Sequence, residues 1–467
     1  PKPKLFDITL LSSFSFSKKP VNVPLIKTAN RTIQTPIPAP GTDEILAKLS
    51  RHEARSMQGT VPLVWDRAQG FNVFDPMGNK WIDFTSAIFI ANIGHSNLRL
   101  IKSIQEVLEQ NLLHHFTYPS KIKATYHEKL IEFTEGEFDK AFLLSGGTEA
   151  TEAALKLMRM NGQRIGKKRL GIISMEGSFH GRTLGSQLLG GIEPQKEWIG
   201  FSDPDIFHIR CPYPWVLEEC SSPKQFLKEE LSKLEKNGTC LETDICGVIM
   251  ETFQGWASLF YPKSFMKDIE SFCRVNNILL TMDEVQAGFA RTGKRFGYQH
   301  YEIKPDLITC GKGMGSGVAL SGVLGKSEIM DIPEVGMMSS TNSANPIACA
   351  GGMATVEEIL KNNLVVEAQR KGILFHKELN KLKDKYHENI SYVFGKGMIA
   401  SVLFKSAQTN KPDSLLSSIV AETCMQKGLL VVHTGRESVK MGPPLTISDD
   451  ALLEGLSVLD EAIAERI

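Results

Sequence analysis

Lys312 is the residue of this sequence best suited to act as a nucleophile. It lies between two glycines in Gly311-Lys312-Gly313 and directly follows the apolar run DLITC. A lysine amine becomes a nucleophile when its pKa is lowered, and flanking glycines let another group approach the backbone closely. A lone lysine is more often a solvated surface residue, so the interpretation depends on the motifs around it.

An acidic pair ends the preceding apolar run. NNILLTM leads into Asp283-Glu284, which places two carboxylates at the end of a predicted strand. A buried acid that stays ionised needs a cationic partner. A protonated pyridine nitrogen would be such a partner, and so would a structural arginine.

A third motif, SGGTEATEAALK over 145–156, leads through glycines from a predicted strand into a helix. Free backbone amides and the helix dipole make such a helix start a place to hold a phosphate, here at Gly147 and Thr148. The motif is neither a P-loop nor a GxGxxG turn, and glycine-rich turns before helices are often only turns.

The three motifs together suit one cofactor. Its phosphate, ring nitrogen and aldehyde would need three different partners, which the helix start, Asp283 and Lys312 supply. Phe179, in Phe179-His180-Gly181-Arg182, adds an aromatic ring that could stack on a cofactor ring, although a buried phenylalanine is ordinarily core.

The elements that carry these motifs alternate in type. AFLL, LGIISM, ICGVIMET, NNILLTMDE and PDLITC predict strands, and helical stretches such as TEATEAALKLMRM lie between them. This alternation predicts an α/β fold with a mostly parallel sheet that helices cover on both faces. Such sheets bind ligands at the carboxyl ends of their strands, where all three motifs lie.

A smaller α+β domain is predicted from both ends of the chain. It takes a helix within residues 40–60, two helices between about Asn345 and Tyr386, strands around SYVFGKGMIASVLF and GLLVVHT, and a closing helix from Ser448. The expected division is an N-terminal arm over 1–39, the first part of the small domain over 40–70, the large domain over 71–338, and the rest of the small domain over 339–467.

Composition argues against several classes of binding partner. The 467 residues include 53 basic and 53 acidic ones, so bulk charge predicts neither a nucleic-acid partner nor an acidic membrane surface. No apolar run approaches the ~20 residues of a membrane span. The eight cysteines show no CxxC pair and no metal-ligand spacing, which indicates reduced thiols, no metal site and a cytoplasmic location.

The first forty residues are rich in Lys, Ser and Thr, and Asp7 is the only acid before Asp43. This composition loosely resembles an organelle transit peptide. A mobile arm is the interpretation adopted here.

The motifs match a known family. MDEVQAGFARTG followed by PDLITCGKGMGSG resembles the class III (subgroup II) pyridoxal-phosphate aminotransferases of fold type I, which include 4-aminobutyrate, ornithine and ω-amino acid transaminases. SFHGRT, VFDPMGNKWIDF, Gly94-His95 and TNSANPIACA are further matches, and the resemblance runs from about residue 31 to the C-terminus.

The resemblance implies pyridoxal 5'-phosphate as cofactor and a role for each matching residue. Lys312 would form the Schiff base with the aldehyde, Asp283 would pair with the pyridine nitrogen, Gln286 would contact the ring hydroxyl, Gly147 and Thr148 would hold the phosphate, Phe179 would stack on the ring, and Thr341 would reach the phosphate of the neighbouring subunit. The last role implies a homodimer with shared active sites.

Two positions depart from the family pattern. Gln254-Gly255-Trp256 replaces the QGE of many members, so Trp256 stands at the position of a gating glutamate. The motif VKMGPPL puts Lys440 where those members have a carboxylate-binding arginine. Lysine lacks the planar fork that grips a carboxylate bidentately, so α-carboxylate recognition would be weaker or differently arranged. Trp256 would add apolar area or a stacking platform for a sugar or aromatic substrate, or simply pack.

The sequence therefore predicts a ping-pong aminotransferase. Its donor would be an ω-amino acid, amine or amino sugar, and its acceptor a carbonyl compound or 2-oxo acid. An aminomutase, decarboxylase or epimerase on the same fold is the alternative, because the cofactor carries the chemistry and the protein selects the bond. A non-catalytic binding protein that kept the fold is the second alternative.

Overall fold

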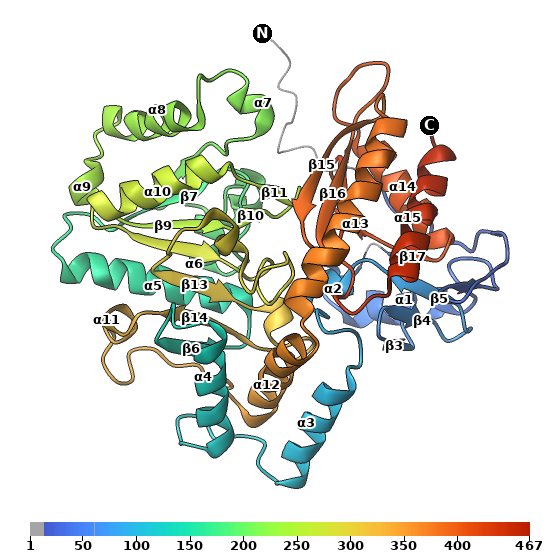
Figure 1. The fold of residues 1–467 in the computed structure, drawn as a ribbon, viewed down its shortest axis with the longest axis horizontal. Coiled ribbons are helices and arrows are strands. Elements are labelled where there is room, and N and C mark those ends of the chain that lie inside the picture. The colour runs from blue at the N-terminus through green and yellow to red at the C-terminus, as the bar shows by residue number, and fades with distance from the viewer. Residues whose placement is uncertain (1–13, 60) are drawn as a thin grey trace. The chain divides into compact units, whose positions relative to one another are not determined.

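The computed structural model describes residues 14–59 and 61–467, which form two compact units (Figure 1). The large unit is Leu98–Val366, and the second unit joins the described residues up to Asn97 with Glu367–Ile467. Residues 1–13 of the predicted N-terminal arm lie outside the described residues.

These bounds differ from the domain bounds expected from the sequence. Residues 71–97 group with the second unit because β5 (Lys80–Asp83) pairs with β17 (Leu429–Leu430) near the other end of the chain. Residues 339–366 group with the large unit because α12 (Pro346–Lys361) packs against helices α3 (Leu98–Glu109) and α4 (Lys121–Phe133) of that unit.

A seven-stranded sheet forms the centre of the large unit, in the order β6-β14-β13-β12-β9-β7-β8. Its strands are β6 (Lys140–Leu144), β7 (Gly171–Met175), β8 (Ile206–Ile209), β9 (Ile245–Glu251), β12 (Leu279–Asp283), β13 (Leu307–Cys310) and β14 (Ser321–Gly325). Strands β13, β12, β9, β7 and β8 are parallel, and β14 runs antiparallel to both β13 and β6.

Helices cover both faces of this sheet. Every residue of β9 and β12 is buried, and because successive side chains point to opposite faces, both faces must be covered. Ala150, Ala154 and Met158 of α5 (Gly147–Arg164) pack with sheet residues such as Ile249 and Val323 in one apolar cluster. The predicted mostly parallel sheet between helices is confirmed.

The other elements of the large unit surround the sheet. They are α3 (Leu98–Glu109), α4 (Lys121–Phe133), α5 (Gly147–Arg164), α6 (Leu184–Leu189), α7 (Pro214–Leu217), α8 (Pro223–Lys236), α9 (Leu241–Asp244), α10 (Lys263–Val275), α11 (Ser327–Met330), α12, and the two-stranded sheet of β10 (Phe253–Gln254) and β11 (Leu259–Phe260).

The second unit contains two sheets. One comprises β1 (Ile26–Lys27), β2 (Thr32–Ile33), β5, β4 (Asn72–Phe74), β3 (Arg67–Gln69) and β17; the other comprises β15 (Ile390–Lys396), β16 (Ile399–Phe404), β19 (Ser438–Met441) and β18 (Val432–His433). Its helical elements are α1 (Thr42–His52), α2 (Ser86–Phe89), α13 (Leu364–Lys385, which starts in the large unit), α14 (Ser414–Gln426) and α15 (Asp449–Ala464).

The predicted helices of this unit are observed, and Ser448 caps α15 by accepting a hydrogen bond from the amide of Ala451. Among the described helices, none combines the length and the hydropathy that a bilayer crossing requires.

Candidate active site

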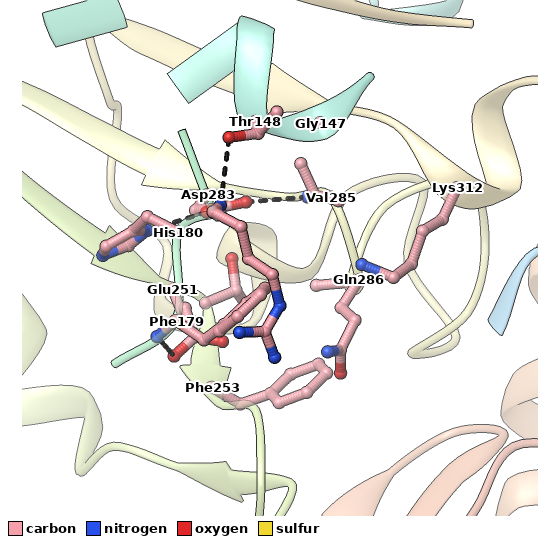
Figure 2. A pocket seen from close by; sticks show the side chains of 14 residues that line it. Gly147, Thr148, Phe179, His180, Glu251, Phe253, Asp283, Val285, Gln286 and Lys312 are labelled. Atoms are coloured by element: carbon pink, nitrogen blue, oxygen red, sulfur yellow. Dashed lines mark hydrogen bonds and ion pairs between the residues drawn. The ribbon is translucent and has the colours of Figure 1, made fainter. Parts of the chain in front are cut away.

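A cavity of about 300 Å³ opens at the carboxyl ends of β9, β12 and β13 in the large unit (Figure 2). This is where the sheet topology predicts a ligand site. Six of the nine residues singled out in the sequence line it: Gly147, Thr148, Phe179, Asp283, Gln286 and Lys312.

Asp283, the last residue of β12, is the acid at the base of this cavity. Its Oδ2 lies 2.8 Å from His180 Nδ1, and its Oδ1 accepts a hydrogen bond of 3.0 Å from the amide of Val285. The side chain is only 6% exposed. These two contacts hold the carboxylate in one orientation, and Figure 2 shows the His180 and Val285 contacts on either side of it.

Lys312 follows β13 and extends its side chain into the cavity (Figure 2). Burial lowers the pKa of its amine below the ordinary lysine value, and the nearby carboxylates of Asp283 and Glu251 partly offset that effect. The lowered pKa increases the fraction of neutral, nucleophilic amine at a given pH. Its φ of 41° lies in the left-handed region, which non-glycine residues rarely adopt.

The start of α5 forms another wall of the cavity. A Cβ at Gly147 would come 2.9 Å from Val285 Cγ1, so only glycine fits this close approach. The first amides of a helix have no intrahelical acceptor, which leaves the amides of Gly147 and Thr148 to bind an anion.

Two functional candidates were missed in the sequence. Glu251, at the end of β9, is 6% exposed, lines the cavity, and accepts a hydrogen bond of 3.1 Å from the amide of Phe179. Arg182 lines the cavity as well, with its guanidinium carbon 5.4 Å from the centre of the Phe179 ring. Glu251 could have been found as a third acid at a strand end, in ICGVIMET.

The other three predicted residues do not line the cavity. Trp256 donates a hydrogen bond of 3.2 Å from Nε1 to the hydroxyl of Tyr213, whose ring stacks on Trp215 at 4.7 Å. Thr341 is exposed in the large unit. Lys440 lies on β19 of the second unit, 2% exposed, with Nζ 4.7 Å from the centre of the Phe89 ring.

Phe89 belongs to an unusual turn. The four residues of α2, Ser86 to Phe89, have φ between 49° and 67°, so this turn is left-handed. Each such residue costs roughly 1–2 kcal/mol relative to a right-handed one. The buried hydroxyl of Ser86, which donates a hydrogen bond of 2.6 Å to the carbonyl of Gly442, helps to hold the turn.

The residues present fit pyridoxal phosphate. An amine for the aldehyde, a buried carboxylate for a ring nitrogen, helix-start amides for a phosphate and an aromatic side chain for the ring face line one cavity of suitable size. Among the described residues, no group of three or more His, Cys, Asp or Glu side chains is arranged to hold a metal ion.

Comparisons with known proteins identify the family of this chain. The family model for class III aminotransferases matches residues 54–463. The chain is 30% identical to a 4-aminobutyrate aminotransferase of Mycobacterium leprae (93% of this chain, 98% of that protein) and 32% identical to the 5-aminovalerate aminotransferase DavT of Pseudomonas aeruginosa (91% and 99%). It is also 31% identical to a leucine/methionine racemase of Thermococcus litoralis (91% and 96%).

Solved structures show the same fold. An (S)-enantioselective omega-transaminase from Thermomicrobium roseum superposes with a TM-score of 0.82 at 28% identity, covering 91% of this chain and 99% of that one. An amine transaminase from an uncultivated Pseudomonas species, in its pyridoxal-phosphate-bound form, gives 0.80 at 25% identity, covering 89% and 97%. The chain therefore belongs to the class III aminotransferases, enzymes of fold type I that transfer amino groups with pyridoxal phosphate.

Proposed function

We propose that this aminotransferase takes the amino group of a donor whose negative charge is remote from its amine, above all an ω-amino acid, and passes it to a carbonyl or 2-oxo acid acceptor in a ping-pong reaction. The observation that carries the proposal is Arg182, an arginine in the wall of the cavity that contains Lys312. A guanidinium binds a carboxylate bidentately, and an ω-amino acid presents its carboxylate several bonds away from the amine.

The residues that line the cavity would hold the cofactor as the family resemblance implies. Lys312 would bind its aldehyde covalently, Asp283 its ring nitrogen, Gln286 its ring hydroxyl and Phe179 its ring face, with Gly147 and Thr148 at its phosphate. When bound, pyridoxal phosphate supplies an electron-withdrawing ring that makes the C–H bond beside the substrate amine acidic.

The chain's own groups then act on that C–H bond. The charge of Asp283, fixed by its contacts to His180 and Val285, favours the protonated ring nitrogen. The amine of Lys312, whose pKa burial lowers, would accept the proton from the substrate carbon and return it later.

Two departures from the family pattern and two relatives support a donor other than an α-amino acid. Lys440 stands where many members of the family have a carboxylate-binding arginine and cannot grip a carboxylate bidentately, and Trp256 stands where they have a gating glutamate. The 4-aminobutyrate and 5-aminovalerate aminotransferases named above act, by their names, on ω-amino acids. Amines and amino sugars are the further donor classes to test.

A donor panel tests the proposal. The visible absorption band of the holoenzyme should be lost with 4-aminobutyrate or 5-aminovalerate, and Arg182→Gln should raise the KM for these donors roughly 10- to 100-fold. The KM for an uncharged amine should stay the same in that variant, and Arg182→Lys should fall between the two. A response to glutamate and alanine alone would overturn the proposal.

Racemisation is a second candidate, because racemases of Thermococcus litoralis and Pyrococcus horikoshii are 31% and 28% identical to this chain. A racemase removes the proton from the carbon that bears the amine and returns a proton to the opposite face, so the amino group stays on that carbon and no second substrate is needed. A single chiral amino acid incubated with the holoenzyme therefore separates the two functions: an aminotransferase leaves its configuration unchanged.

We also propose a cytoplasmic homodimer with shared active sites. The segment 98–118 of the large unit exposes an unusual number of large apolar side chains, among them Leu98 (80%), Leu113 (56%) and Tyr118 (74%). A second copy of the chain would cover them, and the exposed Thr341 would reach the partner's phosphate site. All eight cysteines are free thiols, which suits a reducing compartment.

A further inference from the structure

A chain of hydrogen bonds links a glutamate of α5 to the loop that carries Phe179 and Arg182. Thr183 donates its hydroxyl proton to Oε1 of Glu152 at 2.6 Å, and its oxygen lies 2.7 Å from Thr148 Oγ1. Thr148 Oγ1 in turn lies 3.2 Å from the amides of both Arg182 and Thr183.

Counting protons sets the direction of these bonds. A threonine hydroxyl has one proton to donate and two lone pairs to accept with. Because the proton of Thr183 goes to Glu152, the bond between the two threonines must use the proton of Thr148. The two lone pairs of Thr148 then accept the two amides, so its hydroxyl has no capacity left for a phosphate.

The hydroxyl of Thr148 therefore makes all of these hydrogen bonds to the loop that carries Phe179 and Arg182. Gly181 passes so close that a Cβ there would lie 2.2 Å from Thr148 Oγ1, and its φ of 143° also favours glycine. Thr151, one turn further along α5, donates a hydrogen bond of 2.7 Å to the carbonyl of His180. Glu152 also accepts the amides of Gly185 (2.8 Å) and Ser186 (3.1 Å) at the start of α6.

We propose that Glu152 is a positioning residue of the active site. Through Thr183 it makes the hydroxyl of Thr148 an acceptor for loop amides, which holds the Phe179 ring and the Arg182 guanidinium in the cavity wall. The cofactor phosphate is left to the backbone amides of Gly147 and Thr148. The inference rests on the cofactor roles proposed above for Phe179, Gly147 and Thr148.

The test measures binding to the apoenzyme, without any amine substrate. Dissociation constants are determined for pyridoxal phosphate, by quenching of protein fluorescence, and for inorganic phosphate, by competition. Glu152→Ala and Thr148→Val should each weaken pyridoxal phosphate binding roughly 10-fold and leave inorganic phosphate binding unchanged. Thr183→Val, at an exposed position, breaks the same chain of hydrogen bonds. It should have the same effect on binding, and it replaces Glu152→Ala in the test if that variant does not fold.

Two controls accompany the measurement. Glu152→Gln keeps the accepting Oε1 and should retain the wild-type affinity, and Lys156→Ala, on the same helix, should do the same. The proposal is overturned if Thr148→Val weakens phosphate as much as pyridoxal phosphate, because the hydroxyl is then a phosphate ligand, or if the variants at 152 and 183 bind the cofactor as the wild type does. A failed donor panel would leave these binding results untouched.

Discussion

At the residue scale, the chemistry of the site depends on where two charges are held. Lys312 is kept in a left-handed backbone conformation directly after β13, and its amine is buried near the carboxylates of Asp283 and Glu251. Residues in such conformations persist only where the surrounding structure imposes them, and they concentrate at functional sites. A Cβ at the preceding Gly311 would lie 3.3 Å from Val285 Cγ1, so glycine at that position allows the close packing around Lys312.

Replacing Lys312 tests its role as covalent partner and proton carrier. Lys312→Ala should reduce transamination at least ~1,000-fold, since it removes the general acid-base group, and should abolish covalent trapping of the cofactor by borohydride. Far-ultraviolet circular dichroism of the variant should match that of the wild type. An active variant, or one still trapped by borohydride, would contradict the assignment.

The lowered pKa of Lys312 should be visible in its reactivity. The rate at which borohydride-trappable pyridoxal phosphate forms on the apoenzyme should rise with pH and level off below pH 10.5, the ordinary lysine value, because only the neutral amine attacks. Asp283→Asn removes a carboxylate that raises this pKa, so the profile should move to lower pH. A shift to higher pH would show that another charge dominates.

At the scale of elements, a buried carboxylate connects the end of β12 to the segment that follows it. Glu284 accepts hydrogen bonds of 2.7 Å from the amides of Gly297 and Tyr298, and a further one from the hydroxyl of Thr252. Burial raises the pKa of Glu284 to about 8, although the hydrogen bonds from Thr252 and Gly297 lower it in part. The site acid Asp283 is its neighbour in the chain, so the end of β12 is anchored by this network.

This pKa makes the stability of the protein depend on pH. Between pH 4.5 and about 8 the folded protein retains a proton on Glu284 that the unfolded chain releases. The contribution of this group to the free energy of unfolding is therefore full below pH 4.5 and is lost as the pH rises to about 8. The loss should amount to a few kcal/mol. Urea unfolding midpoints of the wild type and Glu284→Gln, compared from pH 5 to 8, measure it: the advantage of the wild type should shrink as pH rises. A constant difference would contradict the raised pKa.

The packing of α12 on α4 gives a stability prediction. Gly352 of α12 lies so close to Tyr126 of α4 that a Cβ would come 2.3 Å from its ring, and Tyr126 is fully buried. Gly352→Ala should therefore destabilise the protein by about 1–3 kcal/mol, seen as a lower melting temperature. Gly59→Ala, at a site with open space, is the matched control and should change little.

At the scale of the whole molecule, the proposed dimer would complete each active site with Thr341 of the neighbouring chain. Mixing two inactive variants tests this. In a hybrid of Lys312→Ala and Thr341→Asp subunits, one of the two sites has both a wild-type lysine and a wild-type threonine. Mixed and refolded chains should regain about a quarter of the wild-type activity, as random pairing in a twofold dimer gives. No recovery on mixing would show that the sites are not shared.

The sequence alone was enough to predict the sheet and six of the residues that line the cavity, and its resemblance to a known family supplied the cofactor. Strand and helix periodicity are local: Asp283 ends β12, Lys312 lies two residues after β13, and α5 starts three residues after the end of β6. Because the carboxyl ends of parallel strands meet at one edge of a sheet, these local patterns were sufficient to bring the residues together. The prediction of one cavity thus needed no knowledge of contacts between distant segments.

Only the tertiary structure decided the remaining features. The strand β14, SGVLG, contains two glycines and little β-forming signal, yet it pairs antiparallel between β6 and β13. The partner of Trp256 is Tyr213, the ring beneath Lys440 is Phe89, and the hydroxyl of Thr148 is committed to Thr183. Each of these pairs joins segments far apart in the chain, and such pairs are set by how folded surfaces pack, which no local pattern of residue types encodes.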